Sequence, residues 1–208
     1  MKSVADLGIE YKGGSLNCSY NELTSLEVVP LHFEVGIYCS ANKLTSLNGA
    51  PSHVGGGFYC SYNKLTSLEG APSRVNGGFD CFDNKLTSLE GAPSHVGGDF
   101  NCYSNTLTSL AGAPSHAGGG FYCAFNELTS LKDVHKHIAE IKGAFYAIEN
   151  PIESHVLGLL LIKGVTEVRL DNKQIEEILN KHLGKGRAGM LMAQEELIEA
   201  GLEEFAQL

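Results

Sequence analysis

Apolar and polar positions recur along this chain with a period of 21 residues. The clearest unit, GGGFYCSYNKLTSL at residues 55–68, is followed one period later by NGGFDCFDNKLTSL. Within a unit, a phenylalanine and a cysteine alternate with variable residues, as in a strand that buries one face. An asparagine and the two leucines of LTSL follow. Because one such unit cannot bury its apolar side alone, the repetition predicts coils that stack into a solenoid.

Three positions are identical in six consecutive units. They are a cysteine (Cys18, Cys39, Cys60, Cys81, Cys102 and Cys123), an asparagine (Asn21, Asn42, Asn63, Asn84, Asn105 and Asn126) and a leucine (Leu23, Leu44, Leu65, Leu86, Leu107 and Leu128). Strand alternation sends Phe58 and Cys60 inward, and Leu65 and Leu68 follow beyond the bend. Asn63 lies where the chain turns, so we expect its amide to satisfy backbone groups of its own coil and the next. The Pro- and Gly-containing stretch that follows the first five LTSL segments predicts an extended or turn-like back in most coils.

The unit resembles the leucine-rich-repeat pattern L-x-x-L-x-L-x-x-N-x-L, with Phe58 and Cys60 at the strand leucines and Asn63 at the asparagine. The resemblance covers about residues 13–152. Its short period and LTSL wording resemble the bacterial type of repeat, including the recognition domains of secreted bacterial effectors. The glycine-rich wording also resembles repeats in uncharacterised bacteriophage-encoded proteins. The resemblance implies a right-handed α/β solenoid with a parallel sheet on the concave face, a mostly non-helical convex side and an α-helical C-terminal cap.

The regular units are flanked by segments with a different pattern. Residues 1–12, with apolar Val4, Leu7 and Ile9, predict a small N-terminal cap. Residues 13–153 predict seven coils, of which the last is degenerate and is expected to hold a helix at 133–142 and a strand at 145–148. Residues 154–208 predict a candidate eighth coil and a helical C-terminal cap, because the open end of a solenoid must be covered.

The C-terminal segment is expected to be largely helical. Residues 154–162 predict a first helix, and the template of an eighth coil is matched by Val165, Val168, Leu170, Lys173, Ile175 and Ile178, with lysine where asparagine belongs. Two further helices are predicted near 172–183, ending on Gly184, and near 188–205. The second of them is expected to place Leu191, Leu197, Ile198 and Leu202 on one face.

Composition narrows the classes of function. The formal net charge of −9 disfavours binding to a nucleic-acid backbone, which requires a basic stripe. The segment SHVLGLLLI is too short to span a membrane, and MKSVADLGIEY lacks an apolar signal core. We therefore expect a cytoplasmic protein, located in the host cytoplasm if it is phage-encoded.

Candidate chemistry is sparse. The six cysteines share one inward position, so we expect buried, reduced thiols rather than disulfides or a metal site. No phosphate-binding loop, H-E-x-x-H or G-x-S-x-G motif occurs. The effectors with similar repeats carry a large catalytic domain after them, and the roughly 55 residues that follow here are too few for it. We therefore expect no enzyme activity, no cofactor and no metal.

Three columns vary while the frame stays constant. The first outward position reads Asn17, Tyr38, Tyr59, Asp80, Asn101, Tyr122, Tyr146; the second reads Ser19, Ser40, Ser61, Phe82, Tyr103, Ala124, Ile148; the third reads Tyr20, Ala41, Tyr62, Asp83, Ser104, Phe125, Glu149. Tyr, Ser, Asn, Asp and Gly on a rigid frame are typical of antibody binding loops. The residues that we expect to contact a partner are Tyr38, Tyr59, Tyr62, Asp80, Phe82, Asn101, Tyr103, Tyr122, Phe125 and Tyr146.

Two other columns carry basic side chains. Lys43, Lys64 and Lys85 form a stripe beside the asparagines that we interpret as a solvated edge. On the convex side, a column of His32, His53, Arg74, His95 and His116 follows the prolines. Stacked imidazoles can bind metal or respond to pH, but Arg74 interrupts the column, which favours an ordinary surface position.

Protein binding is the function that these columns favour. Eight strands at ~4.8 Å spacing, each ~17 Å long, give a face of roughly 650 Å², near the ~800 Å² that each partner contributes to a standard interface. The resemblance to phage repeats sharpens this expectation to a virus-encoded protein that binds and inhibits a host protein such as a defence enzyme. Two alternatives stay open: a structural, virion or homo-oligomeric assembly protein, in which the tyrosines are a structural ladder, and a protein that sequesters a small ligand. A small ligand needs a pocket, which we do not expect on a smooth parallel sheet.

Overall fold

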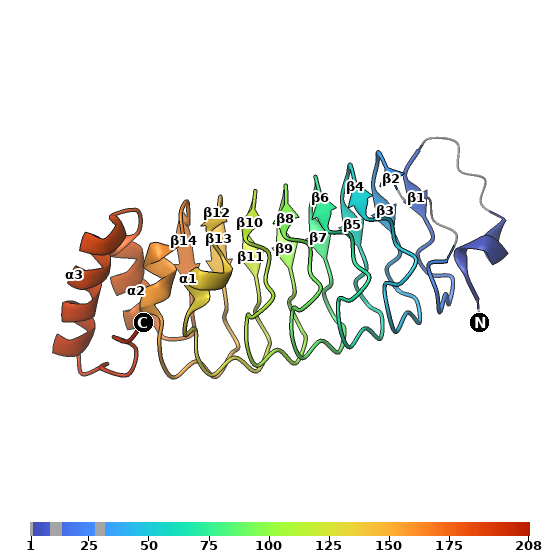
Figure 1. Ribbon diagram of the computed structural model, residues 1–208. Helices are drawn as coiled ribbons and strands as arrows, with labels where there is room; N and C mark the ends of the chain where they lie inside the picture. The colour runs from blue at the N-terminus through green and yellow to red at the C-terminus, as the bar shows by residue number, and fades with distance from the viewer. Residues whose placement is uncertain (1, 9–13, 28–31) are drawn as a thin grey trace.

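The computed structural model describes residues 2–8, 14–27 and 32–208. The chain winds into a row of coils, with the N- and C-termini at opposite ends and two helices beside the last coils (Figure 1). The coils contribute strands to two parallel sheets, one of eight strands and one of six. The predicted solenoid with a parallel sheet, a non-helical back in the regular units and a helical C-terminal end is confirmed.

The eight-stranded sheet is built from the strand segments of the repeat, which in the first six coils read an apolar residue, a variable residue and a cysteine. Its strands in spatial order are β1 (Leu16–Asn17), β3 (Ile37–Tyr38), β5 (Phe58–Tyr59), β7 (Phe79–Asp80), β9 (Phe100–Asn101), β11 (Phe121–Tyr122), β13 (Ala144–Tyr146) and β14 (Glu167–Arg169). In the regular units each residue pairs with the one 21 positions further on, as Phe58 does with Phe79. Because the sequence period equals the pairing register, identical positions form straight columns along the solenoid.

The second sheet forms where the sequence predicted only an extended back. Its strands in spatial order are β12 (Glu140–Ile141), β10 (His116–Ala117), β8 (His95–Val96), β6 (Arg74–Val75), β4 (His53–Val54) and β2 (His32–Phe33). Each has two residues, and its inward residue is apolar and buried, as for Val54 and Val96. The pairing therefore comes from the stacking of equal coils and not from the propensity of any one segment.

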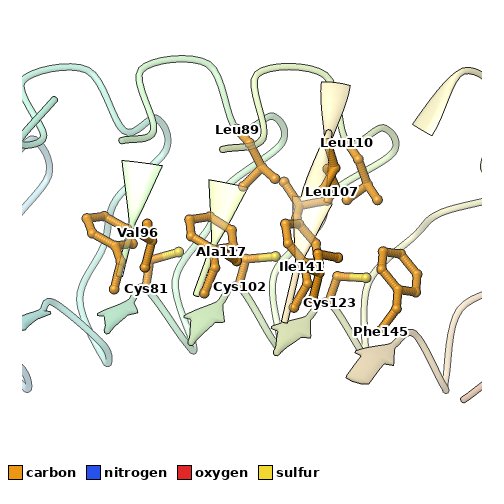
Figure 2. Close-up of a cluster of buried hydrophobic side chains, with 14 of the residues drawn as sticks. Cys81, Leu89, Val96, Cys102, Leu107, Leu110, Ala117, Cys123, Ile141 and Phe145 are labelled. Carbon is orange, nitrogen blue, oxygen red and sulfur yellow. The ribbon is translucent and has the colours of Figure 1, made fainter. Parts of the chain in front are cut away.

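Apolar side chains from both sheets fill the interior between them. Cys81, Cys102 and Cys123 point inward in the same orientation in successive coils, opposite Val96 and Ala117 of the six-stranded sheet (Figure 2). All six cysteines are buried and none forms a disulfide, which confirms the predicted free thiols. Burial raises the pKa of Cys18 to about 11 and raises the pKa values of the other five as well.

The asparagine column joins each coil to its neighbour. The Asn63 amide donates to the carbonyl oxygens of Cys60 (3.0 Å) in its own coil and Cys39 (3.1 Å) in the preceding coil, and its oxygen accepts from the Leu44 N–H (3.0 Å). Asn42, Asn84, Asn105, Asn126 and Asn150 repeat this set. The amides thus satisfy backbone groups of the preceding coil, whereas we expected the next one.

Both ends of the solenoid are covered. At the N-terminal end, the short 3₁₀ helix η1 (Val4–Leu7) buries Val4, and the backbone of Lys2 pairs with Thr24 of the first coil. The predicted cap residue Ile9 lies outside the described residues. At the C-terminal end, the helices α2 (Lys173–His182) and α3 (Gly186–Glu199) pack against each other and against the 3₁₀ helix η2 (Leu157–Leu161).

Side chains of α2 close the last edge of the eight-stranded sheet. The Asn180 amide donates to the Val168 carbonyl and accepts from the Val168 N–H, both at 2.8 Å. Glu176 accepts the Leu170 N–H at 3.0 Å. Burial works to raise the pKa of Glu176, but the bonds from Leu170, Lys173 and Arg169 outweigh it and hold that pKa below its ordinary value. These groups take the place of a ninth strand, so the edge is not free to pair with another chain.

Several C-terminal details differ from the sequence predictions. The helix expected at 133–142 is limited to α1 (Val134–His137), because Glu140–Ile141 instead pairs in parallel with β10. The predicted apolar face of the last helix is wrong: Leu191 and Ile198 are half exposed. The buried stripe is Met190, Ala193 and Leu197, because their i, i+3, i+7 spacing puts them on one face of α3. Over the described residues, the helices are all too short or too polar to cross a lipid bilayer.

Candidate functional site

The residues that we expect to contact a partner gather along the outer side of the eight-stranded sheet and the turn after it. On each strand the inward neighbours are fully buried, as Phe58 and Cys60 are around Tyr59. The ten residues expected at the site are half-buried or exposed, with Tyr38 39% and Tyr62 53% exposed, whereas Ser61 and Ala124 of the second outward column are buried. The outer side is therefore available for contact without disturbing the core.

The third outward column has an unusual backbone. Its residues all have positive φ: Tyr20, Ala41, Tyr62, Asp83, Ser104, Phe125 and Glu149 lie between 51° and 59°. This left-handed conformation is uncommon outside glycine and worst for β-branched residues, and the column contains no valine, isoleucine or threonine. The frame therefore restricts this column sterically but leaves the size and charge of its side chains open.

Four aromatic side chains form a continuous ridge across four coils. Tyr62, Phe82, Tyr103 and Phe125 make successive ring contacts with centroids 4.8, 5.1 and 4.9 Å apart. The two ends of the ridge come from the third column and the middle from the second. Tyr62 and Phe125 are 53% and 44% exposed. An aromatic surface of this kind on the outside of a protein marks a contact site more often than an isolated exposed ring does.

The tyrosines of the first column form two pairs with a gap between them. Tyr38 and Tyr59 stack with centroids 4.9 Å apart and ring planes 9° from parallel, and Tyr122 contacts Tyr146 at 6.3 Å. The two intervening positions are the shorter Asp80 and Asn101. The stack is therefore interrupted for two coils.

Glycines of the preceding column leave room for the rings to lean along their own strands. A β-carbon at Gly57 would come within 2.5 Å of the Tyr59 ring, and one at Gly120 within 2.7 Å of the Tyr122 ring. At Gly78, in the Asp80 coil, the nearest atom to such a carbon would be the Asp99 carbonyl oxygen at 3.3 Å, with no ring atom closer than the Tyr59 hydroxyl at 4.0 Å. The backbone at Gly78 is thus left uncovered by any ring.

This gap forms a hollow with a volume of about 450 Å³. Its lining includes Tyr59, Gly78, Asp80, Asp99, Asn101 and Tyr122. The volume falls in the range of ~300–1,000 Å³ that is typical of ligand sites. Our expectation that a parallel sheet forms no pocket is therefore wrong here, because two missing rings hollow out an otherwise even surface.

The hollow is acidic. The Phe82 N–H donates to Asp80 at 2.9 Å, and desolvation raises the pKa of this half-buried carboxyl above its ordinary value. None of the ion pairs found in the described part of the chain involves Asp80. The exposed Asp99 accepts the Gly120 N–H at 2.7 Å. Desolvation also raises the pKa values of Tyr59 and Tyr122, so both phenols stay protonated at neutral pH.

The two other columns show ordinary surface chemistry. Lys43, Lys64 and Lys85 are exposed, and Lys43 pairs with Glu22 at 2.7 Å. On the six-stranded sheet the His95 and His116 rings lie 5.9 Å apart. Desolvation, followed by the charges of Arg74, His116 and Lys142, lowers the pKa of His95, which favours its neutral form. Among residues 2–8, 14–27 and 32–208, three or more His, Cys, Asp or Glu side chains do not cluster as metal ligands would.

Two parts of this surface were missed from the sequence. Asp99 stands where Gly36, Gly57, Gly78 and Gly120 stand in other coils, and it supplies the rim of the hollow. Gly78 supplies backbone at the bottom of the hollow that no ring covers. The signal was present in the first column, since two short residues between tyrosines leave a space two coils wide. The chemical types in that column do not reveal the space, whereas the sizes of its side chains do.

Comparisons with known proteins place the fold. No protein-family profile and no curated protein matches the sequence. Among solved structures, the leucine-rich-repeat domain of a Shigella effector is similar with 21% identity and a TM-score of 0.58, over 79% of this chain and 73% of that one. YopM, a leucine-rich effector protein from Yersinia pestis, is similar with 22% identity and a TM-score of 0.48, over 76% of this chain and 49% of that one. At these identities the similarity concerns the fold.

Proposed function

We propose that this chain is a non-enzymatic protein-binding module that contacts its partner through the outer side of the eight-stranded sheet. The observation that carries the proposal is the aromatic ridge of Tyr62, Phe82, Tyr103 and Phe125 beside the hollow. Rigid aromatic side chains give a large contact area at a small cost in conformational entropy. The asparagine-linked frame beneath them is fixed before binding, which lowers the ordering cost further.

A purely structural role for the outer aromatics fits less well. Stacked tyrosines do stabilise a sheet, as Tyr38 and Tyr59 show by their geometry. A carboxylate at Asp80 does not stabilise such a stack. The Asp80 side chain is half-buried, its pKa is raised, and none of the ion pairs of the described residues includes it. Groups that lower stability in this way are found at functional sites more often than elsewhere.

The resemblance of the repeats to phage-encoded proteins supports a more specific form of the proposal. In that form the chain is virus-encoded, acts in the host cytoplasm and inhibits a host protein, such as a defence enzyme, by occupying one of its surfaces. No catalytic residue is needed for inhibition of this kind. The roughly 650 Å² of the sheet face is enough for a protein interface when one edge is added.

Affinity capture from bacterial lysate tests the proposal. We expect the wild-type protein to enrich one protein, and we expect Tyr62→Ala combined with Phe125→Ala to lower its affinity by ~1–3 kcal/mol per anchor ring. Tyr20→Ala is the matched control, because Tyr20 has the same residue type and backbone conformation but lies outside the ridge. Equal loss with Tyr20→Ala, or no loss with the ridge variant, would contradict the proposal.

The hollow favours a second candidate, the sequestration of a small molecule. Its volume of about 450 Å³ suits a ligand that fills the gap between Tyr59 and Tyr122. This candidate predicts a small molecule that co-purifies with the protein and is seen by native mass spectrometry. Light scattering separates both candidates from a homo-oligomeric assembly, which would show a mass above that of one chain of 22.2 kDa.

A further inference from the structure

The hollow lies where two successive positions of the first outward column, Asp80 and Asn101, carry no ring. Tyr59 stacks on Tyr38 through one ring face, with centroids 4.9 Å apart, and it lines the hollow on its other side. Asp80 occupies the next position of the column. A planar group placed over Gly78 would continue the stack on Tyr59 at a similar spacing. The open ring face therefore selects for a flat group.

The charge of the hollow selects for a cation. Asp80 and Asp99 both line it, and its lining contains no lysine, arginine or histidine. The bond from the Phe82 N–H involves one oxygen of Asp80, which leaves acceptor capacity facing the hollow. A neutral ligand would bury the Asp80 charge further without compensating it, and an anion would be repelled.

We propose, on the basis of the proposed function, that the hollow receives an arginine side chain of the protein partner, with its guanidinium stacked on Tyr59 and paired with Asp80. Guanidinium is planar, carries five donors and stacks on aromatic rings. A lysine ammonium would pair with the carboxylate but would leave the ring face uncovered. The volume of about 450 Å³ also has room for backbone and a neighbouring side chain beside the arginine.

NMR titration of the isotopically labelled, full-length protein tests this assignment at weak affinity. The probes are an acetylated and amidated Gly-Arg-Gly peptide, the same peptide with citrulline, the same peptide with lysine, and free arginine amide. Citrulline has nearly the shape of arginine without its charge. We expect the arginine peptide to cause saturable shifts at the amides of Gly78, Asp80 and Gly98, with the lysine peptide several-fold weaker and the citrulline peptide without effect.

A matched pair of variants separates the site from overall charge. Asp80→Asn keeps the side-chain shape and the bond to the Phe82 N–H, as Asn101 accepts the Tyr103 N–H at 3.1 Å one coil later. We expect it to weaken binding of the arginine peptide at least ~10-fold, since it removes the charge from a charge-assisted hydrogen bond. Asp83→Asn changes the net charge by the same amount, at an exposed residue outside the lining, and we expect less than ~2-fold change because water screens an exposed charge.

Three results of the NMR titrations would each overturn the assignment. They are equal effects of the two aspartate variants, equal binding of the arginine and citrulline peptides, and the absence of saturable shifts at the hollow. Tighter binding of free arginine amide than of the arginine peptide would overturn the protein source and assign the hollow to a small cation. If the captured partner is lost with the ridge variant but kept by Asp80→Asn, the arginine assignment fails while the proposed function stands. If Asp80→Asn abolishes capture and the ridge variant does not, the result supports the arginine assignment and shows that the ridge is not needed for capture.

Discussion

Two aromatic stacks run along opposite sides of the eight-stranded sheet, and only one of them is continuous. On the inner side, Phe58, Phe79, Phe100, Phe121 and Phe145 stack in sequence with centroids 5.1–5.7 Å apart. On the outer side, the tyrosine stack stops after Tyr59 and resumes at Tyr122. Both sides share one strand register, so the register does not cause the interruption.

The two sides differ because the inner side must be closely packed, whereas the outer side faces solvent. An inner gap would leave a cavity in a close-packed interior, which costs stability directly. An outer gap fills with water and costs little. The inner columns are therefore fixed by folding, whereas the outer columns are free to be set by binding.

Thiol labelling should give the largest contrast between the two sides. We expect none of the six cysteines to react in the folded protein within the time that labels all six in urea, because they are buried and burial raises their pKa values. Tyr62→Cys places a thiol on the outer side as a control, and it should react at once. Mass spectrometry counts the labels, and rapid labelling of the unmodified protein would show that the inner columns are not sealed.

Phe79→Ala should have the largest effect on stability. It removes one ring from the middle of the inner stack, and such truncations cost ~3–5 kcal/mol in the free energy of unfolding. Phe82→Ala, in the same coil but on the outer side, is the control and should cost far less. Urea denaturation followed by circular dichroism measures both. Similar losses would mean that the two sides contribute equally to folding.

Asn63→Ala should rank next. It leaves the buried Leu44 N–H without its acceptor, and an unsatisfied buried group costs ~1–3 kcal/mol. The carbonyls of Cys39 and Cys60 each lose one amide donor but keep those of Asn42 and Asn84. Hydrogen exchange should show the opening of the second and third coils before the rest of the chain. A variant with unchanged stability would mean that water or backbone shifts replace the amide.

Tyr59→Ala and Tyr122→Ala should affect binding more than they affect stability. We expect each to lower affinity for the captured partner by ~1–3 kcal/mol and to lower stability less than Phe79→Ala does. Calorimetric titration and thermal melting of the same samples give the two numbers. If affinity is intact while the melting temperature falls, the outer tyrosines are a structural ladder.

Asp80→Asn should have the smallest effect, and a favourable one. Desolvation raises the folded pKa of Asp80 above 3.8, so the stability that this group contributes is present below pH 3.8 and is lost as pH rises through the folded pKa. The variant should therefore match the wild type near pH 3 and exceed it at pH 7. Urea unfolding at both pH values measures the difference. A variant that is less stable at pH 7 would show that the charge is compensated in the folded protein.

Much of the inner side is readable from the sequence because the core repeats its chemistry in every coil. Cys60, Asn63 and Leu65 recur at fixed positions, and strand alternation alone assigns their direction. The six-stranded sheet is not readable in this way. His53–Val54 has two residues beside glycines, and its pairing depends on neighbouring coils that lie 21 residues away.

The outer side was predicted in composition but not in shape. The ten residues expected at the site gather on one surface, but the hollow depends on the sizes of Asp80 and Asn101 relative to Tyr59 and Tyr122. The left-handed column is likewise hidden, because Tyr62 and Phe125 carry no glycine signal at positive φ. Periodicity reports which side a residue faces, whereas the contour of a surface depends on the neighbours of each residue along the stack.

The register of 21 residues has a consequence for how such a surface changes over generations. Asp80 pairs with Asn101, and Asn101 with Tyr122, at that fixed spacing. A gene duplication of one repeat would therefore insert a whole coil without disturbing pairing on either side. Copying the unit that carries Asn101 would lengthen the hollow by ~4.8 Å, and deleting it would shorten the hollow by the same step. Recombination between near-identical repeats thus offers a graded series of site lengths, while point mutation adjusts the chemistry within each step.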